Sequence, residues 1–427
     1  MERVFIDGMW QYKVDMLQAA ALGAIMYYFG IWMRSKVSAF VKYSIPAPVI
    51  GGLVIAIATA VLQAKGIASF AFDGTLQRVF MIFFFCTVGM NASYKLVMKG
   101  GVIIIAFWAV STFIAVLQNA ANFPITAAFG LDPLMGIIAG SVPMIGGLGT
   151  AGAFGALFED EYAVKGALSA GIACATFGMV AGSILGGPIG EWIIKLHKLI
   201  TPKHDAHKST KETPLEAEKT RFENESELAQ DSLVDEDEYK VSGPHLMKTI
   251  SWIIIASGIG SAVSYYLKMA GITLPPYLGA MMVAIIIRNI GDKTEIFEID
   301  TKGIDIISDI TLGLYITMAI NSLQLVQLVN LAMPLMIMMA VQIVLIIVAA
   351  YFLIFLPFGK NYDSTVMASG LIGFGLGATP NALVCMQALT AKYGPSAKAF
   401  FVVPIVGAFL VDISNATVIA IMASFFR

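Results

Sequence analysis

Long apolar runs alternate with short polar stretches along most of the chain. Two of these runs, 101–116 and 331–358, contain no charged residue. About 20 consecutive apolar residues are enough for a helix to cross a bilayer. We therefore predict ten membrane helices in two groups of five. Their expected ranges are 14–33, 46–64, 76–92, 101–120 and 164–194, followed by 248–267, 275–290, 304–320, 330–357 and 396–425.

Each group is interrupted by a glycine- and proline-rich break just before its fifth helix. The first break, about 133–158, contains Pro143 and a Gly-Gly-Leu-Gly run, and the second, about 364–391, contains alternating glycines and Pro380. Neither residue type supports a continuous helix. Such backbone survives at membrane depth only when it is buried in protein or lines a cavity. We predict one re-entrant loop in each half.

The two halves are related by a constant offset. The Gly-Leu-Gly sequence at 147–149 recurs 228 residues later at 375–377, and the same offset pairs Pro48 with Pro276. A constant offset is typical of a duplicated unit. In a membrane protein, broken segments at matching places in two halves point to a transport site.

The distribution of Lys and Arg predicts the orientation, because cytoplasmic loops are enriched in both. The segments after the first and third helices are basic, whereas 321–330, the counterpart of the second of them, has neither residue type. We expect N- and C-termini outside and repeats of inverted topology, which would operate by alternating access. The expected domains are repeat 1–195, a cytoplasmic linker at 196–247 and repeat 248–427.

Composition restricts the function further. Apolar residues make up 58% of the chain, charged residues 13%, and the net charge is −2. These values indicate a protein surrounded by membrane lipids, with no nucleic-acid partner. The acidic linker is interpreted as a tether, the alternative being a regulatory segment. No nucleophile–base pair, phosphate loop or metal cluster is recognisable, so we expect neither an enzyme nor an organic cofactor.

The breaks carry the first candidate site. A helix that starts after a glycine-rich turn presents free N–H groups and a positive dipole end, which suit carboxylates. Thr150 follows the first turn, and Thr379 and Asn381 follow the second. The alternative is that the small residues only permit tight helix packing.

Polar residues within the predicted spans carry the second candidate site. Asp412 lies in the last span, where an ionisable residue is a functional candidate. We predict that it binds Na⁺ with help from Ser414 or Asn415, the alternatives being a lysine partner or a position near the outer interface. Thr87 and Asn91 are either neutral sodium ligands or a helix cap.

Several long motifs resemble those of the bacterial sodium/glutamate symporters of the glutamate:Na⁺ symporter (ESS) family. These motifs include IPAPVIGGL at 45–53, FFFCTVGMNAS at 83–93, ACATFGMVAGSILGGP at 173–188, and the longer segments at 130–155 and 373–416. The resemblance implies a bacterial cytoplasmic membrane protein in which two re-entrant loops form the translocation site. The matching loop positions are Gly146, Gly147, Gly149, Thr150, Gly375, Gly377, Thr379 and Asn381. Leu148 stands where the family often has histidine.

The expected function is sodium-coupled symport of L-glutamate, with Na⁺ as the coupling ion. The alternatives are a sodium- or proton-coupled carrier of another carboxylate, such as a 2-hydroxy or dicarboxylic acid, and, from other classes, a channel or a ligand sensor. A homodimer is possible, but the sequence does not determine the oligomeric state.

Overall fold

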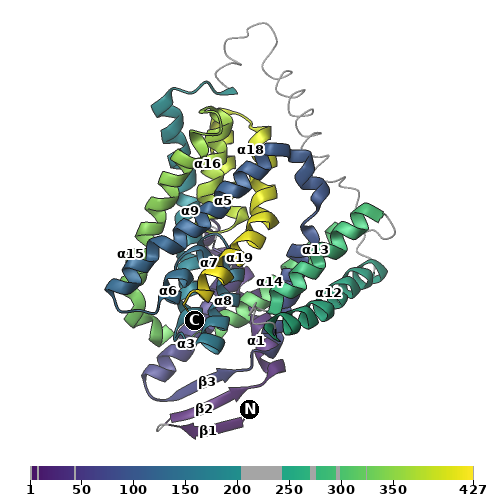
Figure 1. The fold of residues 1–427 in the computed structure, drawn as a ribbon. Coiled ribbons are helices and arrows are strands. Elements are labelled where there is room, and N and C mark those ends of the chain that lie inside the picture. Colours follow the sequence, from purple (N-terminus) through teal and green to yellow (C-terminus); the bar gives the residue numbers. More distant parts are fainter. Residues whose placement is uncertain are drawn as a thin grey trace.

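The computed structural model describes residues 2–6, 9–42, 45–202, 243–269, 276–294, 299–323 and 325–426. Helices dominate both halves (Figure 1). The first half contains α1 (Met16–Lys36), α2 (Ser38–Lys42), α3 (Ala47–Ala64), α4 (Thr75–Asn91), α5 (Tyr94–Ala128), α6 (Pro133–Ile138), α7 (Ser141–Met144), α8 (Gly147–Tyr162) and α9 (Ala167–His197). The second contains α12 (Gly243–Met269), α13 (Pro276–Thr294), α14 (Thr301–Asn321), α15 (Leu325–Ala349), α16 (Tyr362–Gly375), α17 (Thr379–Tyr393), α18 (Ala397–Ile405), α19 (Val411–Ser424) and the π-helical turns η1 (Ala350–Phe355) and η2 (Val406–Leu410).

The expectation of a multi-pass helical membrane protein is confirmed. Within the described ranges, eight helical segments are long and apolar enough to cross a membrane. The other two predicted spans are also helices. Of these, α4 has only 17 residues, and α13 carries Arg288, Asp292 and Lys293 near its end. Residues 203–242 of the predicted linker, which include its acidic part, lie outside the described residues.

A three-stranded sheet at the N-terminal end was not predicted. Strand β1 (Glu2–Ile6) pairs antiparallel with β2 (Met9–Val14), which pairs in parallel with β3 (Ala68–Phe72) (Figure 1). Val14 packs against Ala19 of α1 and Met318 of α14, so the sheet rests on the ends of these helices. Its strands have only five or six residues. They are therefore too short to stand out as long apolar runs in the sequence.

The helices form two bundles, and each half of the chain contributes to both. Bundle A consists of the first three spans of each half, namely α1, α3, α4, α12, α13 and α14. Bundle B consists of α5–α9 and α15–α19, which include both breaks. In Figure 1, α12 and α13 of bundle A lie on the right and α15 and α16 of bundle B on the left. Contacts between the bundles involve mainly α3, α4 and α14 of bundle A.

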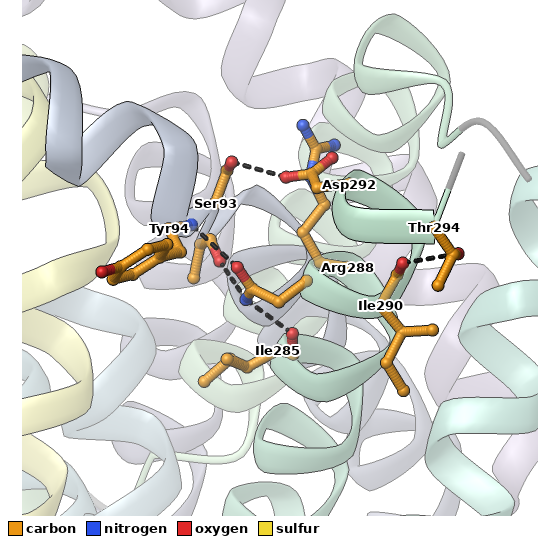
Figure 2. A network of polar contacts seen from close by, with 9 residues as sticks. Ser93, Tyr94, Ile285, Arg288, Ile290, Asp292 and Thr294 are labelled. Atoms are coloured by element: carbon orange, nitrogen blue, oxygen red, sulfur yellow. Dashed lines mark hydrogen bonds and ion pairs between the residues drawn. The ribbon is translucent and has the colours of Figure 1, made fainter. Parts of the chain in front are cut away.

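The connection from bundle A to α5 is fixed by polar contacts with α13 (Figure 2). The Tyr94 N–H donates to the Asn289 side chain at 2.8 Å, and the Asn289 amide donates to the Ala92 carbonyl at 3.0 Å. Asp292 accepts from the Ser93 hydroxyl and from Arg288. Because Asn289 and Asp292 belong to the second half, this network joins the two halves at the point where the chain leaves bundle A.

The two halves follow the same order of helices, as a duplicated unit requires. Helices α6 and α7 together correspond to α16, and α8 corresponds to α17. Helix α9 corresponds to α18–α19. The spacings are close to the 228-residue offset of the sequence. The inversion of the second half relative to the membrane stays a prediction.

Two glycines on α12 provide a test of the packing within bundle A. A Cβ at Gly260 would lie 2.2 Å from the Ala280 Cα of α13, whereas a Cβ at Gly258 would meet open space. We expect Gly260→Ala to lower the free energy of unfolding by about 1–3 kcal/mol, because α12 and α13 must separate. Gly258→Ala should raise it by roughly 0.5–1 kcal/mol through helix propensity. Thermal unfolding in detergent measures both, and equal effects of the two variants would contradict the packing.

Candidate functional site

Both predicted breaks interrupt helices in the protein interior. In the first, the short helices α6 and α7 precede α8, which begins at Gly147 with a backbone φ of 62°. In the second, α16 ends at Gly375 and α17 begins at Thr379. No side chain caps the N-terminus of α8 or of α17. Their first N–H groups are therefore not occupied by a capping side chain.

The two breaks touch one another. A Cβ at Gly147 would lie 2.8 Å from the Gly377 carbonyl oxygen. Both residues are buried, whereas Gly146 and Thr379 are half-buried and lie toward the margins of the junction. Glycine at position 147 thus meets two requirements, since it permits the positive φ and leaves room for the second break.

The second break is held by α9 of the first half. The Asn381 side-chain amide donates to the Met179 carbonyl at 2.6 Å and to the Ser183 hydroxyl at 2.9 Å. The Ser369 hydroxyl donates to the Gly186 carbonyl at 2.9 Å. A Cβ on α9 at Gly178 would lie 2.1 Å from the Leu376 carbonyl oxygen, so only glycine permits this approach.

The first break is held by α5 and by α19 of the second half. The Ser141 N–H donates to the Asn119 side-chain oxygen at 2.8 Å, and the Asn415 amide donates to the Ser141 carbonyl at 3.0 Å. The Asn122 amide donates to the Gly136 carbonyl at 2.9 Å. Each break is therefore fixed in part by a helix of the opposite half.

A buried chain of amides connects the breaks through α5 and α15. The Gln118 amide donates to the Gly375 carbonyl at 2.8 Å. The Gln342 amide donates to the Gln118 carbonyl at 2.8 Å and to the Asn122 side-chain oxygen at 3.1 Å. Asn122 in turn binds Gly136 of the first break, so one network reaches from α6 to the end of α16.

Four of these amides leave their oxygen atoms without a partner. Each amide nitrogen donates to a backbone carbonyl, which can only accept, so the orientation of the amide is fixed. The buried oxygens without a hydrogen-bond partner are Gln118 Oε1, Gln342 Oε1, Asn381 Oδ1 and Asn415 Oδ1. The surroundings of the breaks are therefore rich in acceptors, as a site for a cation or for hydrogen-bond donors requires.

Sequence reasoning missed most of these amides. Gln118, Asn119 and Gln342 lie inside predicted spans, Asn122 lies two residues beyond one, and all four are fully buried. Polar side chains at such positions cost free energy unless they are paired. An amide within a predicted span was therefore the available signal for the first three.

The predicted sodium ligands on α19 face different neighbours. Asn415 reaches the first break, whereas the Ser414 hydroxyl accepts from the hydroxyl of Thr112 on α5 at 2.8 Å. No ion pair joins Asp412 to a lysine or arginine in the described part of the chain. The structural alternative of a lysine partner thus has no support there.

The other predicted ligands, Thr87 and Asn91, lie on α4 in bundle A. The Thr87 hydroxyl donates to the Phe84 carbonyl at 2.6 Å, and the Asn91 amide donates to Asp305 at 3.2 Å. Both groups therefore have local partners and lie on a different bundle from Asp412.

Aromatic side chains of bundle A cover the start of α8. The Tyr315 hydroxyl donates to the Gly149 carbonyl at 2.7 Å. Tyr277 stacks on Phe85 with ring centroids 4.0 Å apart and meets Phe154 of α8 edge-on. The Tyr277 hydroxyl is buried and unpartnered. An aromatic layer thus separates the glycine-rich start of α8 from the interior of bundle A.

A multi-pass helical protein with broken helices that meet inside it has the construction of a secondary transporter. Comparison with known proteins gives the family. The family model described as "Sodium/glutamate symporter" matches residues 12–395. The chain is 35% identical to the sodium/glutamate symporter of Escherichia coli K12 over 408 residues, which cover 96% of this chain and 97% of that protein. The corresponding protein of Haemophilus influenzae is 31% identical over 411 residues, with coverage of 96% and 97%.

The chain therefore belongs to the sodium/glutamate symporter family. The resemblance seen in the motifs is confirmed, and so is the expectation that the chain is a transporter and not an enzyme.

Proposed function

We propose that the protein transports L-glutamate together with Na⁺ across the bacterial cytoplasmic membrane. The observation that carries this proposal is the buried junction of the two breaks, where Gly147 meets Gly377. The names of the related proteins supply the solute and the ion. In the proposal, the substrate carboxylates bind near the N-termini of α8 and α17, where no side chain caps the helix and the helix dipoles favour anions.

Asp412 is proposed to provide the negative charge of the sodium site. It follows η2 in the last helix, and π-helical turns are frequent at functional sites. A carboxylate within a span is expensive unless it is paired or ligated. No ion pair to Asp412 is present among the described residues, and in this proposal a bound cation is the partner of its charge.

Alternating access is proposed to arise from movement of bundle B relative to bundle A. Both breaks belong to bundle B, so the site would move as one unit. Polar contacts that link the bundles include the Tyr315–Gly149 hydrogen bond and the exposed Arg78–Asp160 ion pair at 3.0 Å. Exposed ion pairs contribute little stability, so breaking this one would oppose the movement only weakly.

We propose the orientation with both termini outside and the linker in the cytoplasm, and the two inverted repeats 1–195 and 248–427. The Glu191–Lys392 ion pair, at 2.7 Å, is compatible with it, because it places the ends of α9 and α17 at the same level. Both ends are cytoplasmic in this topology.

Transport itself is tested with purified protein in liposomes. Labelled glutamate should accumulate only when an inward Na⁺ gradient is present. Uptake driven by a pH gradient and indifferent to Na⁺ would contradict sodium coupling. Preference for another carboxylate would contradict the solute, non-saturating flux would indicate a channel, and binding without uptake would indicate a sensor.

The junction is tested with two glycines of equal backbone conformation. Both Gly147 and Gly130 have a φ of 62°, but only Gly147 has a neighbour, since a Cβ at Gly130 meets nothing within 4 Å. We expect Gly147→Val to abolish uptake while the protein stays folded, because the side chain would separate the breaks. Gly130→Val carries similar backbone strain and should retain uptake. Full activity of the Gly147 variant would refute the junction.

Asp412→Asn should preserve the shape of the side chain while removing its charge. We expect the Na⁺ concentration for half-maximal uptake to rise by roughly one to two orders of magnitude, about 1.4–2.8 kcal/mol of lost binding free energy. The affinity for glutamate at saturating Na⁺ should change much less. Asp309→Asn, on α14 of bundle A, serves as the control. An unchanged Na⁺ requirement in the Asp412 variant would remove this residue from the sodium site.

The orientation is tested with single cysteines at Ala128 and at Lys398, both of which are exposed. The native cysteines are buried, which limits background labelling. A membrane-impermeant thiol reagent should label position 128 in intact cells and position 398 only after permeabilisation. Labelling of both positions from the same side would rule out the proposed topology.

A further inference from the structure

We propose that Ser141 and Asn415 form a cation site at the first break, and that Na⁺ is its occupant. This inference rests on the proposed function, which assigns sodium coupling to the protein, and it uses Asn415, one of the sodium ligands predicted from the sequence. It adds Ser141, a residue of the break itself, as a ligand.

Ser141 is fully buried, and its backbone accounts for its structural role. The N–H group donates to Asn119 Oδ1 at 2.8 Å, and the carbonyl accepts from Asn415 Nδ2 at 3.0 Å and from the Gly146 N–H at 3.1 Å. The hydroxyl oxygen, in contrast, has no hydrogen-bond partner. The serine side chain therefore contributes nothing to the fold that alanine would lack, although its burial costs free energy.

Two other buried serines in the described residues are paired. The Ser111 hydroxyl donates to the Phe107 carbonyl at 2.8 Å, and the Ser369 hydroxyl donates to the Gly186 carbonyl at 2.9 Å. Ser369 is the counterpart of Ser141 in the second half, 228 residues later. The unpaired hydroxyl is thus not a general property of serine in this interior, nor of this position in the repeat.

Asn415 contributes a second unpaired oxygen. Its nitrogen must face the Ser141 carbonyl, which can only accept, so its Oδ1 is directed elsewhere. Asn415 is fully buried, and this oxygen has no donor. Two unpaired oxygens therefore belong to two side chains whose residues are in direct hydrogen-bond contact.

The chemistry of these atoms determines which ion can bind to them. Hydroxyl and amide oxygens are hard, neutral ligands of the type that Na⁺ accepts. An anion would instead meet the Asn415 side-chain oxygen, which can only accept, and the negative charge of Asp412. Asp412 lies three residues before Asn415 on the same helix, hence on nearly the same face, and supplies one nearby negative charge. One carboxylate with neutral oxygens suits a monovalent cation better than a divalent one.

Occupation of this site would join α19 to the first break. Ser141 lies six residues before Gly147, the glycine that meets the second break. A bound Na⁺ would hold Ser141 and Asn415 together and so fix the position of the break to which the substrate binds. Sodium bound here should therefore increase the affinity for the anionic substrate, which is the linkage that symport requires.

The test uses Ser141→Ala, which removes the unpaired oxygen and keeps the three backbone hydrogen bonds named above. Ser369→Ala is the matched control, because it removes a paired hydroxyl from the equivalent position. For each variant, two quantities are measured: the Na⁺-dependent rise in melting temperature of the purified protein without glutamate, and the Na⁺ concentration for half-maximal uptake in liposomes. Ser141→Cys, which replaces the hard oxygen with a soft sulfur of similar position, provides a second variant.

We expect both Ser141 variants to raise the half-maximal Na⁺ concentration about tenfold or more. In the absence of Na⁺, Ser141→Ala should melt at or above the wild-type temperature, because an unsatisfied buried group is removed. Ser369→Ala should melt lower and keep the wild-type Na⁺ requirement.

An unchanged Na⁺ requirement in both Ser141 variants, beside sodium-driven uptake by the wild type, would overturn this site and leave the proposed function standing. A change confined to glutamate affinity at saturating Na⁺ would identify the substrate ammonium as the guest and would also overturn the sodium assignment. A wild-type protein indifferent to Na⁺ in both assays would overturn the sodium coupling and this site together.

Discussion

A polypeptide backbone that stops being helical at membrane depth must find its hydrogen-bond partners inside the protein. Here two such interruptions lie together, and each uses the other half of the chain. Asn381 of the second break binds α9, while Ser141 of the first break accepts from Asn415 on α19. Each break therefore takes part of its hydrogen bonds from the other half. This sharing of buried partners is consistent with the way the two halves interlock in one bundle.

The same requirement leaves several buried polar atoms without a hydrogen-bond partner, and these atoms are available to bind a ligand. The amides around the breaks satisfy backbone carbonyls with their nitrogens, and several of their oxygens have no donor. A fold optimised only for stability would avoid such groups, because each costs free energy. Their position at the junction, together with an Asp412 that has no ion-pair partner among the described residues, is the basis for the proposed link between the packing of the breaks and the binding of a cation.

The sequence predicted those features that arise from local composition. The positions of both breaks were predicted from glycine and proline, and the positions of the spans were predicted from the long apolar runs. The partners of the breaks were not predictable in this way, since Gln118 and Gly375 are 257 residues apart, and Ser141 and Asn415 are 274 apart. The sheet was missed for a related reason, because β2 pairs with β3 across the whole of α1 and α3.

The central claim, that each break is lodged against a helix of the opposite half, is tested most directly by cross-linking. Cysteines replace Ser183 and Asn381, whose side chains are 2.9 Å apart, in a protein without native cysteines and with a protease site in the linker. After oxidation and cleavage, the two halves should migrate together on a non-reducing gel. The pair Thr176 and Asn381, with position 176 about two turns earlier on α9, should give no such band. Separate halves from the Ser183–Asn381 pair would contradict the account.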